Sequence, residues 1–131
     1  MRGQVALEFM IIVGVALSII TLFAAYSWTR NEIATRSNQA DIAANAIASA
    51  ADQLYAQGPG AKTKISIFLP IGYNSTKSSI SNKVVRIAFS SPAGPGEAIA
   101  SSKANLIGTL PSDTGYKILT LELIGGSVQI S

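Results

Sequence analysis

The chain has 131 residues, its formal net charge is +3, and only 13% of its residues are charged. It contains no cysteine and no histidine, which excludes disulfides and thiolate metal sites and removes the commonest metal ligand and the usual general base near neutral pH. The basic residues are scattered rather than clustered, so nucleic acid is not expected as the primary partner. The length suits one modest domain together with an N-terminal segment.

The N-terminal segment is an apolar run with one acidic residue, Glu8, at its head. No residue from Phe9 to Trp28 is charged, and a helix of about 20 residues, at about 1.5 Å per residue, matches a hydrocarbon core of roughly 30 Å. An ionisable side chain in such a run costs about 2.5–3.5 kcal/mol at the bilayer centre and less near its edge. Glu8 therefore needs a partner or a special position.

Three interpretations compete for this segment. A cleaved secretory signal peptide would have an apolar region of about 7–15 residues and a small-residue cleavage site, whereas this run is longer and its helical pattern continues. A plain membrane anchor would leave Glu8 snorkelling at the interface. The third interpretation is a helix that begins in a membrane and ends inside a protein assembly, where Glu8 meets a charge from a neighbour.

The apolar run continues into a longer predicted helix, residues 4–57. All five prolines, and every glycine except Gly3 and Gly14, lie at residue 58 or later. Gly14 is tolerated in a helix that packs against lipid or other helices. The predicted helix is about 80 Å long at 1.5 Å per residue, and one small domain cannot cover it.

The lower half of this helix carries an apolar seam. Ile33, Ala40, Ile47 and Leu54 recur every seven residues. Alanines between them permit close approach of helix backbones. The seam packs on the chain's own domain on one side, on neighbouring helices, or on both. The residues expected in a core built from several helices are Phe9, Ile12, Val13, Ala40, Ala43, Ile47, Ala50 and Leu54.

After residue 57 the hydrophobic period changes to that of strands. Gly125 and Gly126 lie between two such runs and predict a two-residue hairpin, and residues 91–97 are predicted to form a loop. The expected fold class is α+β, a long N-terminal helix followed by an antiparallel β-sandwich or barrel-like domain over residues 58–131. The predicted strands are 62–69, 83–90, 105–110, 116–124 and 127–131.

The predicted β-domain has little that favours catalysis. Its carboxylates, Glu97, Asp113 and Glu122, are far apart in sequence and are interpreted as solvated surface residues. We therefore expect neither an enzyme nor a cofactor. Asn74 begins an Asn-Ser-Thr acceptor sequon and is a candidate for N-glycosylation if a membrane helix places this domain outside the cell.

The start of the chain resembles the class III signal sequence of archaeal type IV pilins. The resemblance rests on Arg2-Gly3-Gln4, on Glu8 four residues after Gln4, and on the apolar helix that follows. It implies that a prepilin peptidase removes residues 1–3 by cutting between Gly3 and Gln4. The stretch "ISIFLPIGY" at 65–73 is also similar to the first strand and turn of archaeal pilin β-domains.

This resemblance implies a structural role. The helix would form the core of an extracellular, adhesive homo-oligomeric filament and the β-domain its exterior. The precursor would wait in the plasma membrane for a pilus assembly platform, and the finished filament would lie at the cell surface. Glu8 would pair with the α-amine of a neighbouring subunit, or with other polar groups near the helix start, and set the register. Two alternatives stay open: a monomeric membrane-anchored surface module that binds a ligand through its β-domain, and a TadE-like minor pseudopilin.

Overall fold

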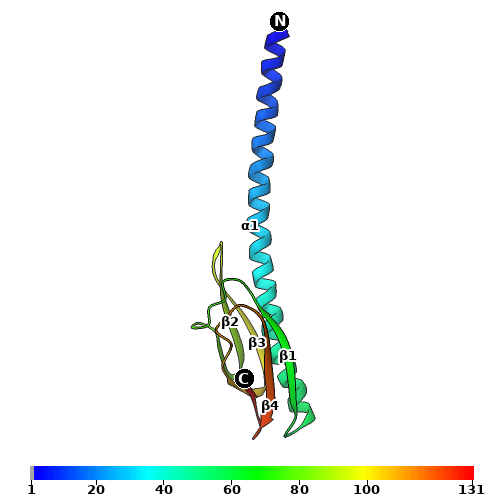
Figure 1. Ribbon diagram of the computed structural model, residues 1–131, viewed down its shortest axis with the longest axis vertical. Helices are drawn as coiled ribbons and strands as arrows, with labels where there is room; N and C mark the ends of the chain where they lie inside the picture. Colours follow the sequence, from blue (N-terminus) through cyan, green and yellow to red (C-terminus); the bar gives the residue numbers. More distant parts are fainter. Residues whose placement is uncertain (1) are drawn as a thin grey trace. The chain divides into compact units, whose positions relative to one another are not determined.

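The computed structural model describes residues 2–131, in which one long helix precedes five strands (Figure 1). Met1, part of the predicted leader, lies outside these residues. The α+β layout is confirmed, and so is an unbroken helix up to residue 57. The elements are α1 (Arg2–Gln57), β1 (Lys62–Leu69), β2 (Ser79–Ser91), β3 (Gly94–Gly108), β4 (Gly115–Ile124) and β5 (Ser127–Ile130).

The chain divides into two units, one that ends at Glu32 and one from Ile33 to Ser131. The division falls inside α1 and not at the predicted boundary at residue 58. The reason is that the second half of the helix supplies part of the core of the β-domain. In the unit up to Glu32, α1 is the sole element among the described residues.

The unit from Ile33 to Ser131 contains one five-stranded sheet in the order β1-β4-β5-β3-β2. All neighbouring strands are antiparallel except β3 and β5, which are parallel. The C-terminal part of α1 lies against one face of this sheet (Figure 1). The helix thus takes the place of the second sheet that a sandwich would have, and the domain has one α layer and one β layer.

The apolar seam of α1 faces this sheet. Ala40, Ala43, Ile47, Ala50 and Leu54 are all buried, and they belong to one core with residues of every strand. Alanine lets the helix lie close to the sheet because its side chain is short. The interpretation that these alanines face neighbouring helices is therefore corrected, since the chain's own strands already cover them.

The predicted strands match the sheet unevenly. The prediction for β1 is confirmed at both ends, and those for β4 and β5 differ by one residue. Gly125 and Gly126 form the predicted hairpin turn, with φ of 58° and 83°. The predicted loop over 91–97 is wrong, because β2 and β3 leave Pro92 and Ala93 alone between them.

Gly96 explains why a glycine-rich stretch forms a strand. It pairs with Phe89 across the β2–β3 ladder, and a side chain at Gly96 would collide with the Phe89 ring, whose Cζ lies 2.6 Å from an ideal Cβ position. The ring therefore covers the glycine and replaces the packing that a side chain would provide.

Polar contacts of Arg36 and of Asp52 join α1 to the sheet. Arg36 Nη1 donates a hydrogen bond to the carbonyl oxygen of Ser90, at 2.7 Å. Asp52 Oδ1 accepts hydrogen bonds from Ser102 Oγ and from the backbone N–H of Lys103, each at 2.7 Å. These hydrogen bonds hold the pKa of Asp52 below its usual value, with Ser102 the largest cause, against the opposing effect of burial.

The Asp52 contact compensates for an irregularity in the sheet. The pairing of β2 with β3 shifts between Asn82, which is opposite Leu106, and Val84, which is opposite Ser101. Residues 102–105 of β3 consequently have no partner on β2. A backbone N–H that has no ladder partner needs another acceptor, and Asp52 accepts from the N–H of Lys103 in this stretch.

A turn after β1 covers part of the outer edge of β2. Gly72 has φ of 87°, and a side chain there would collide with the Ser90 carbonyl oxygen. Ser90 N–H donates to Gly72 O, and Asn74 N–H donates to Ala88 O, both at 2.8 Å. Burial raises the pKa of Tyr73 between them. The turn protects this edge from pairing with another chain and fixes the start of the sequon.

Candidate functional site: the exposed apolar helix

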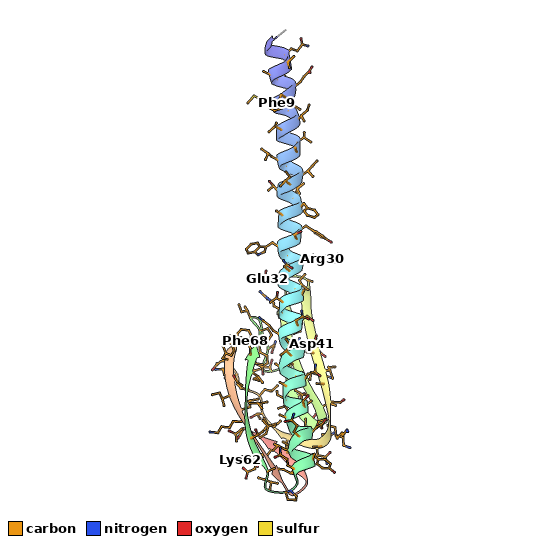
Figure 2. The ribbon with its side chains drawn as sticks, turned by 90° about the vertical axis from the view of Figure 1, so that its right-hand side faces the viewer. Phe9, Arg30, Glu32, Asp41, Lys62 and Phe68 are labelled. Carbon is orange, nitrogen blue, oxygen red and sulfur yellow. The ribbon has the colours of Figure 1, made fainter. Side chains whose placement is uncertain are left out.

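The part of α1 before Ile33 exposes its apolar side chains to an unusual degree. No described side chain from Gly3 to Asn31 is buried. Its large apolar residues, which include Phe9, Ile12 and Val13, are 37% to 77% exposed. Figure 2 shows side chains, among them Phe9, projecting from both visible sides of the helix. We call residues 9–28 the apolar run.

The apolar run is suited to an environment without water. The most apolar window of 18 residues has a mean hydropathy of 2.5, and none of it is buried. By length and composition the helix is able to cross a membrane. A helix that is apolar on every side belongs in lipid or among other helices, whereas a surface helix of a soluble domain has one apolar stripe.

Three hydroxyl groups in this part of α1, those of Ser18, Thr21 and Thr29, have partners inside the helix. Ser18 Oγ donates to Gly14 O and Thr21 Oγ1 donates to Leu17 O, both at 2.8 Å. Thr29 Oγ1 donates to Ala25 O at 3.1 Å. Each bond reaches back one turn, so these three hydroxyl hydrogens need no partner from outside. The cost of placing them in an apolar environment is correspondingly small.

The predicted processing site and Glu8 lie at the beginning of α1. Gly3 and Gln4 are helical and Gln4 is exposed. Glu8 is also exposed and, four residues on, lies on the same helix face as Gln4. Cleavage before Gln4 would therefore place a new α-amine one turn from the carboxylate of Glu8. The predicted pairing of Glu8 with a neighbouring chain stays a prediction.

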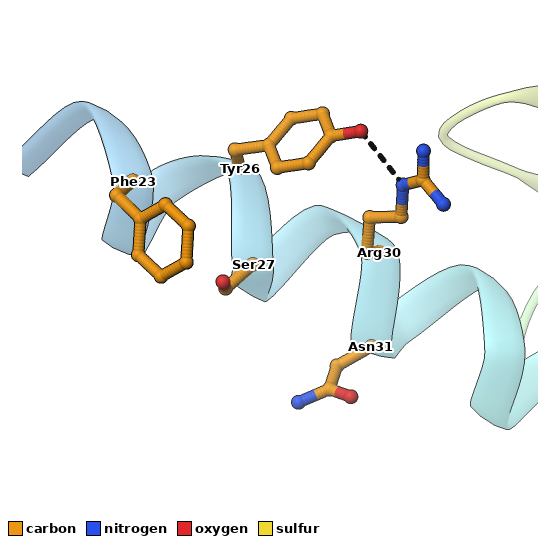
Figure 3. A pocket seen from close by; sticks show the side chains of 5 residues that line it. All are labelled: Phe23, Tyr26, Ser27, Arg30 and Asn31. Carbon is orange, nitrogen blue, oxygen red and sulfur yellow. Dashed lines mark hydrogen bonds between the residues drawn. The ribbon is translucent and has the colours of Figure 1, made fainter.

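The apolar run ends at a polar contact that sequence reasoning missed. Arg30 Nε–H donates to the Tyr26 hydroxyl oxygen at 2.9 Å (Figure 3). The guanidinium carbon lies 5.2 Å from the centroid of the Tyr26 ring, within the range of a cation–π contact. The signal was present in the sequence, because Tyr26 and Arg30 are four residues apart and share a helix face.

This contact forms one wall of a shallow groove on the helix surface. The groove has a volume of about 450 Å³. It lies on a single helix and is open to its surroundings. We call it the Tyr26–Arg30 groove. Its lining residues are Phe23, Tyr26, Ser27, Arg30 and Asn31 (Figure 3).

The sequon lies in the turn that covers β2. Asn74 Oδ1 accepts from Thr76 Oγ1 at 2.6 Å and from Thr76 N–H at 3.1 Å. Asn74 is half-buried and borders a cleft of about 310 Å³. The amide oxygen is thus held by the sequon's own threonine, and Asn74 stays a candidate for modification.

The carboxylates of the β-domain form separate ion pairs on its surface. Glu122 lies 3.2 Å from Lys62, Asp113 lies 3.4 Å from Lys117, and Glu97 lies 3.8 Å from Arg86. Exposed pairs of this kind contribute about 0–1 kcal/mol. Within residues 2–131, no three His, Cys, Asp or Glu side chains gather in a group that could hold a metal ion.

Comparison with protein families, with curated proteins and with solved structures finds no match to this chain. Its functional assignment therefore depends on its own features. The feature that sets it apart from an ordinary α+β domain is the apolar run, which is long enough to cross a membrane and is exposed on every side.

Proposed function

We propose that this chain is the structural subunit of an extracellular type IV pilus filament that mediates surface adhesion. The observation that carries the proposal is the exposed apolar run at the head of a helix whose lower half buries its apolar seam against its own sheet. One continuous helix thus combines a segment that needs partners with a segment that holds its own domain.

The apolar run accepts two environments in turn. Lipid tails are as apolar as the interior of a helix bundle, so moving the run from a membrane into a filament changes its hydrophobic free energy little. Packing between helices then decides the balance. This property suits a subunit that waits in a membrane and later joins an assembly.

The burial of the seam supports one surface of α1 for contacts in such an assembly. The seam from Ala40 to Leu54 is covered by the chain's own sheet. The uncovered side of that part of α1 is mainly polar, with Asp41, Asn45 and Ser49 exposed and Ile42 as its large apolar exception. Contacts between helices are therefore assigned to the apolar run, with Phe9, Ile12 and Val13 near its start. The β-domain is assigned to the filament exterior.

Glu8 is assigned the role of setting the register between neighbouring subunits. After cleavage, Gln4 carries an α-amine whose ordinary pKa is about 7.7–8, so it is largely cationic at neutral pH. Opposite charges attract far more strongly in a dry core than in water, and an uncompensated buried charge is costly. A subunit added in the wrong register would leave both its amine and Glu8 of its neighbour unpaired.

The test compares Glu8→Gln with wild type in cells that carry the prepilin peptidase and the assembly platform. We expect electron microscopy to show filaments for wild type, and intact mass to show loss of residues 1–3. Glu8→Gln is expected to be processed and inserted but to give few filaments. Glu97→Gln, which removes an exposed carboxylate of the β-domain, is the matched control and is expected to give normal filaments.

Two outcomes would contradict the proposal. Abundant filaments from Glu8→Gln would show that Glu8 does not set the register. Processed wild-type protein that stays in the membrane as a monomer would favour the anchored surface module instead.

The same mass measurement tests the proposed glycan, because an added mass at Asn74 must disappear in Asn74→Gln.

A further inference from the structure

We propose that Tyr26 and Arg30 form a binding site for the phosphate group of a membrane lipid and thereby fix the depth of α1 in the bilayer. The inference rests on the membrane-inserted precursor that is part of the proposed function. It concerns the stage before assembly, when the apolar run is surrounded by lipid.

The position of the site follows from the sequence. Arg30 is the first charged residue after Glu8, and the apolar run between them spans about 30 Å at 1.5 Å per residue, the thickness of a hydrocarbon core. Tyr26 and Trp28 are aromatic residues of the kind that concentrates at the membrane–water interface. The Arg30 side chain therefore reaches the layer of lipid headgroups when the run fills the core.

The contact with Tyr26 orients the guanidinium group. A guanidinium has five N–H donors, and the Nε–H is used by the Tyr26 hydroxyl. The two terminal nitrogens point away from the Tyr26 ring (Figure 3). They present the planar fork that pairs well with phosphate oxygens. Because Tyr26 already holds the side chain, less conformational freedom is lost when an anion binds.

The charge of the groove selects an anion. Among its lining residues Arg30 alone is charged, and the others are aromatic, hydroxyl or amide side chains. Glu32 lies about 200° around the helix from Arg30, since each residue turns an α-helix by about 100°. The anions at this depth of a bilayer are the phosphates of lipid headgroups, whose oxygens also accept hydrogen bonds from Ser27 or Asn31.

Trp28 provides an internal probe for the test, because it is the only tryptophan in the chain and it is exposed. The full chain is reconstituted in vesicles of phosphatidylcholine and phosphatidylglycerol, and in vesicles of an uncharged glycolipid without phosphate. Solid-state NMR detects a dipolar contact between ¹³Cζ of Arg30 and lipid ³¹P. Brominated lipids of known bromine position report the depth of Trp28.

We expect the ¹³C–³¹P contact in the phospholipid vesicles and a different Trp28 depth in the glycolipid vesicles. Tyr26→Phe keeps the ring but removes the hydroxyl, and it should weaken the contact. Arg30→Gln should give the same Trp28 depth in both lipids. Lys64→Gln removes the same charge from an exposed position on β1 and should leave contact and depth unchanged.

Three results would overturn the inference, and they separate it from the proposed function. Trp28 at the interface without an Arg30–phosphorus contact would refute the phosphate site but retain the inserted helix. A contact that inorganic phosphate in the buffer abolishes would identify a site for a free anion instead. Trp28 beyond the reach of every brominated lipid would refute the phosphate site and the membrane-inserted precursor together.

Discussion

The two halves of α1 belong to one unbroken helix but have opposite surroundings. Residues 3–31 include bulky phenylalanine, isoleucine, leucine and valine, and none of their side chains is buried. Residues 40–54 are rich in alanine, and most of those alanines are fully buried against the sheet. The most apolar part of the chain is thus its most exposed part.

This difference shows that the residues of α1 that pack inside the chain are not its most hydrophobic ones. Short alanine side chains let the helix approach its own sheet closely, where large side chains would hold it away. Most of the large apolar side chains of α1 lie before Ile33, where the chain offers no cover, whereas Ile47 and Leu54 are buried against the sheet. An apolar surface of this size marks a contact with something outside the chain. Four pairs of variants test the roles assigned to the two halves of α1.

The largest effect is expected from truncating a buried residue of the lower half. Ile47 is fully buried, so Ile47→Ala should lower the free energy of unfolding of the β-domain by about 2–5 kcal/mol. Leu22→Ala removes similar atoms from a residue that is 72% exposed and should change it by less than about 0.5 kcal/mol. Chemical denaturation of the full chain in detergent measures both, and equal losses would remove the distinction between the halves.

A charge introduced into either half of α1 should affect membrane insertion only when it lies in the apolar run. Ile20 and Ile42 are similarly exposed, at 63% and 69%. Ile20→Lys places an ammonium in the apolar run and should oppose membrane insertion by about 2.5–3.5 kcal/mol. Ile42→Lys should insert normally, because that position lies outside the run. Membrane fractionation of the two variants checks this, and normal insertion of Ile20→Lys would show that the run does not lie in lipid.

Enlarging a buried alanine tests whether the seam packs only inside the domain or also between subunits of the proposed filament. Ala43→Leu should destabilise the β-domain by about 1–3 kcal/mol through overpacking. Ala34→Leu, at an exposed position of the same helix, serves as the control and should be nearly neutral. Thermal unfolding followed by circular dichroism distinguishes them. If the Ala43→Leu domain is fully stable but does not assemble, the seam contacts neighbouring subunits.

The smallest effect is expected at Asp52. Asp52→Asn should cost about 1–2 kcal/mol at pH 7, because hydrogen bonds to a charged acceptor are stronger than those to a neutral one. The folded-state pKa of Asp52 is lowered from 3.8. Its stabilising contribution is therefore complete above about pH 4 and is lost as the pH falls through the folded-state pKa.

The stability difference between wild type and Asp52→Asn should accordingly shrink below about pH 4. Unfolding by urea at pH 7 and pH 3 measures it. Asp41→Asn, an exposed substitution on the same helix, should show no such dependence on pH. A difference between wild type and Asp52→Asn that stays constant down to pH 3 would mean that the charge of Asp52 does not stabilise the fold.

Local patterns in the sequence predicted the elements whose causes are local. The absence of proline up to residue 58 marks the extent of α1, and the alternation in residues 62–69 defines β1. The start of β3 was missed because Ala98, Ala100, Ser102 and Ala104 are small and only weakly favour strands. Its Gly/Pro-rich beginning is held by the Phe89 ring, a contact between strands that no local pattern contains.

The polar contacts also differ in whether their cause is local in the sequence. The contact of Tyr26 with Arg30 spans one helical turn, so spacing alone could have revealed it. The contact of Asp52 with Ser102 joins residues 50 positions apart and depends on a shift in strand pairing, which a single sequence does not show. The packing partner of the seam could not be predicted from the sequence either, because alanines at seven-residue spacing can pack against another helix or against a sheet.

The polar contacts of Arg36 and Asp52 with the sheet have a mechanical consequence. Arg36 bonds to β2 and Asp52 to β3, and about 24 Å of helix separates them at 1.5 Å per residue. Tension carried along the helices of a filament would load both contacts, and the apolar interface between them, in shear. Elements loaded in shear share the force among many bonds at once, whereas elements pulled apart at one end break bonds one after another. The β-domain would then stay attached under forces that peel a hairpin open.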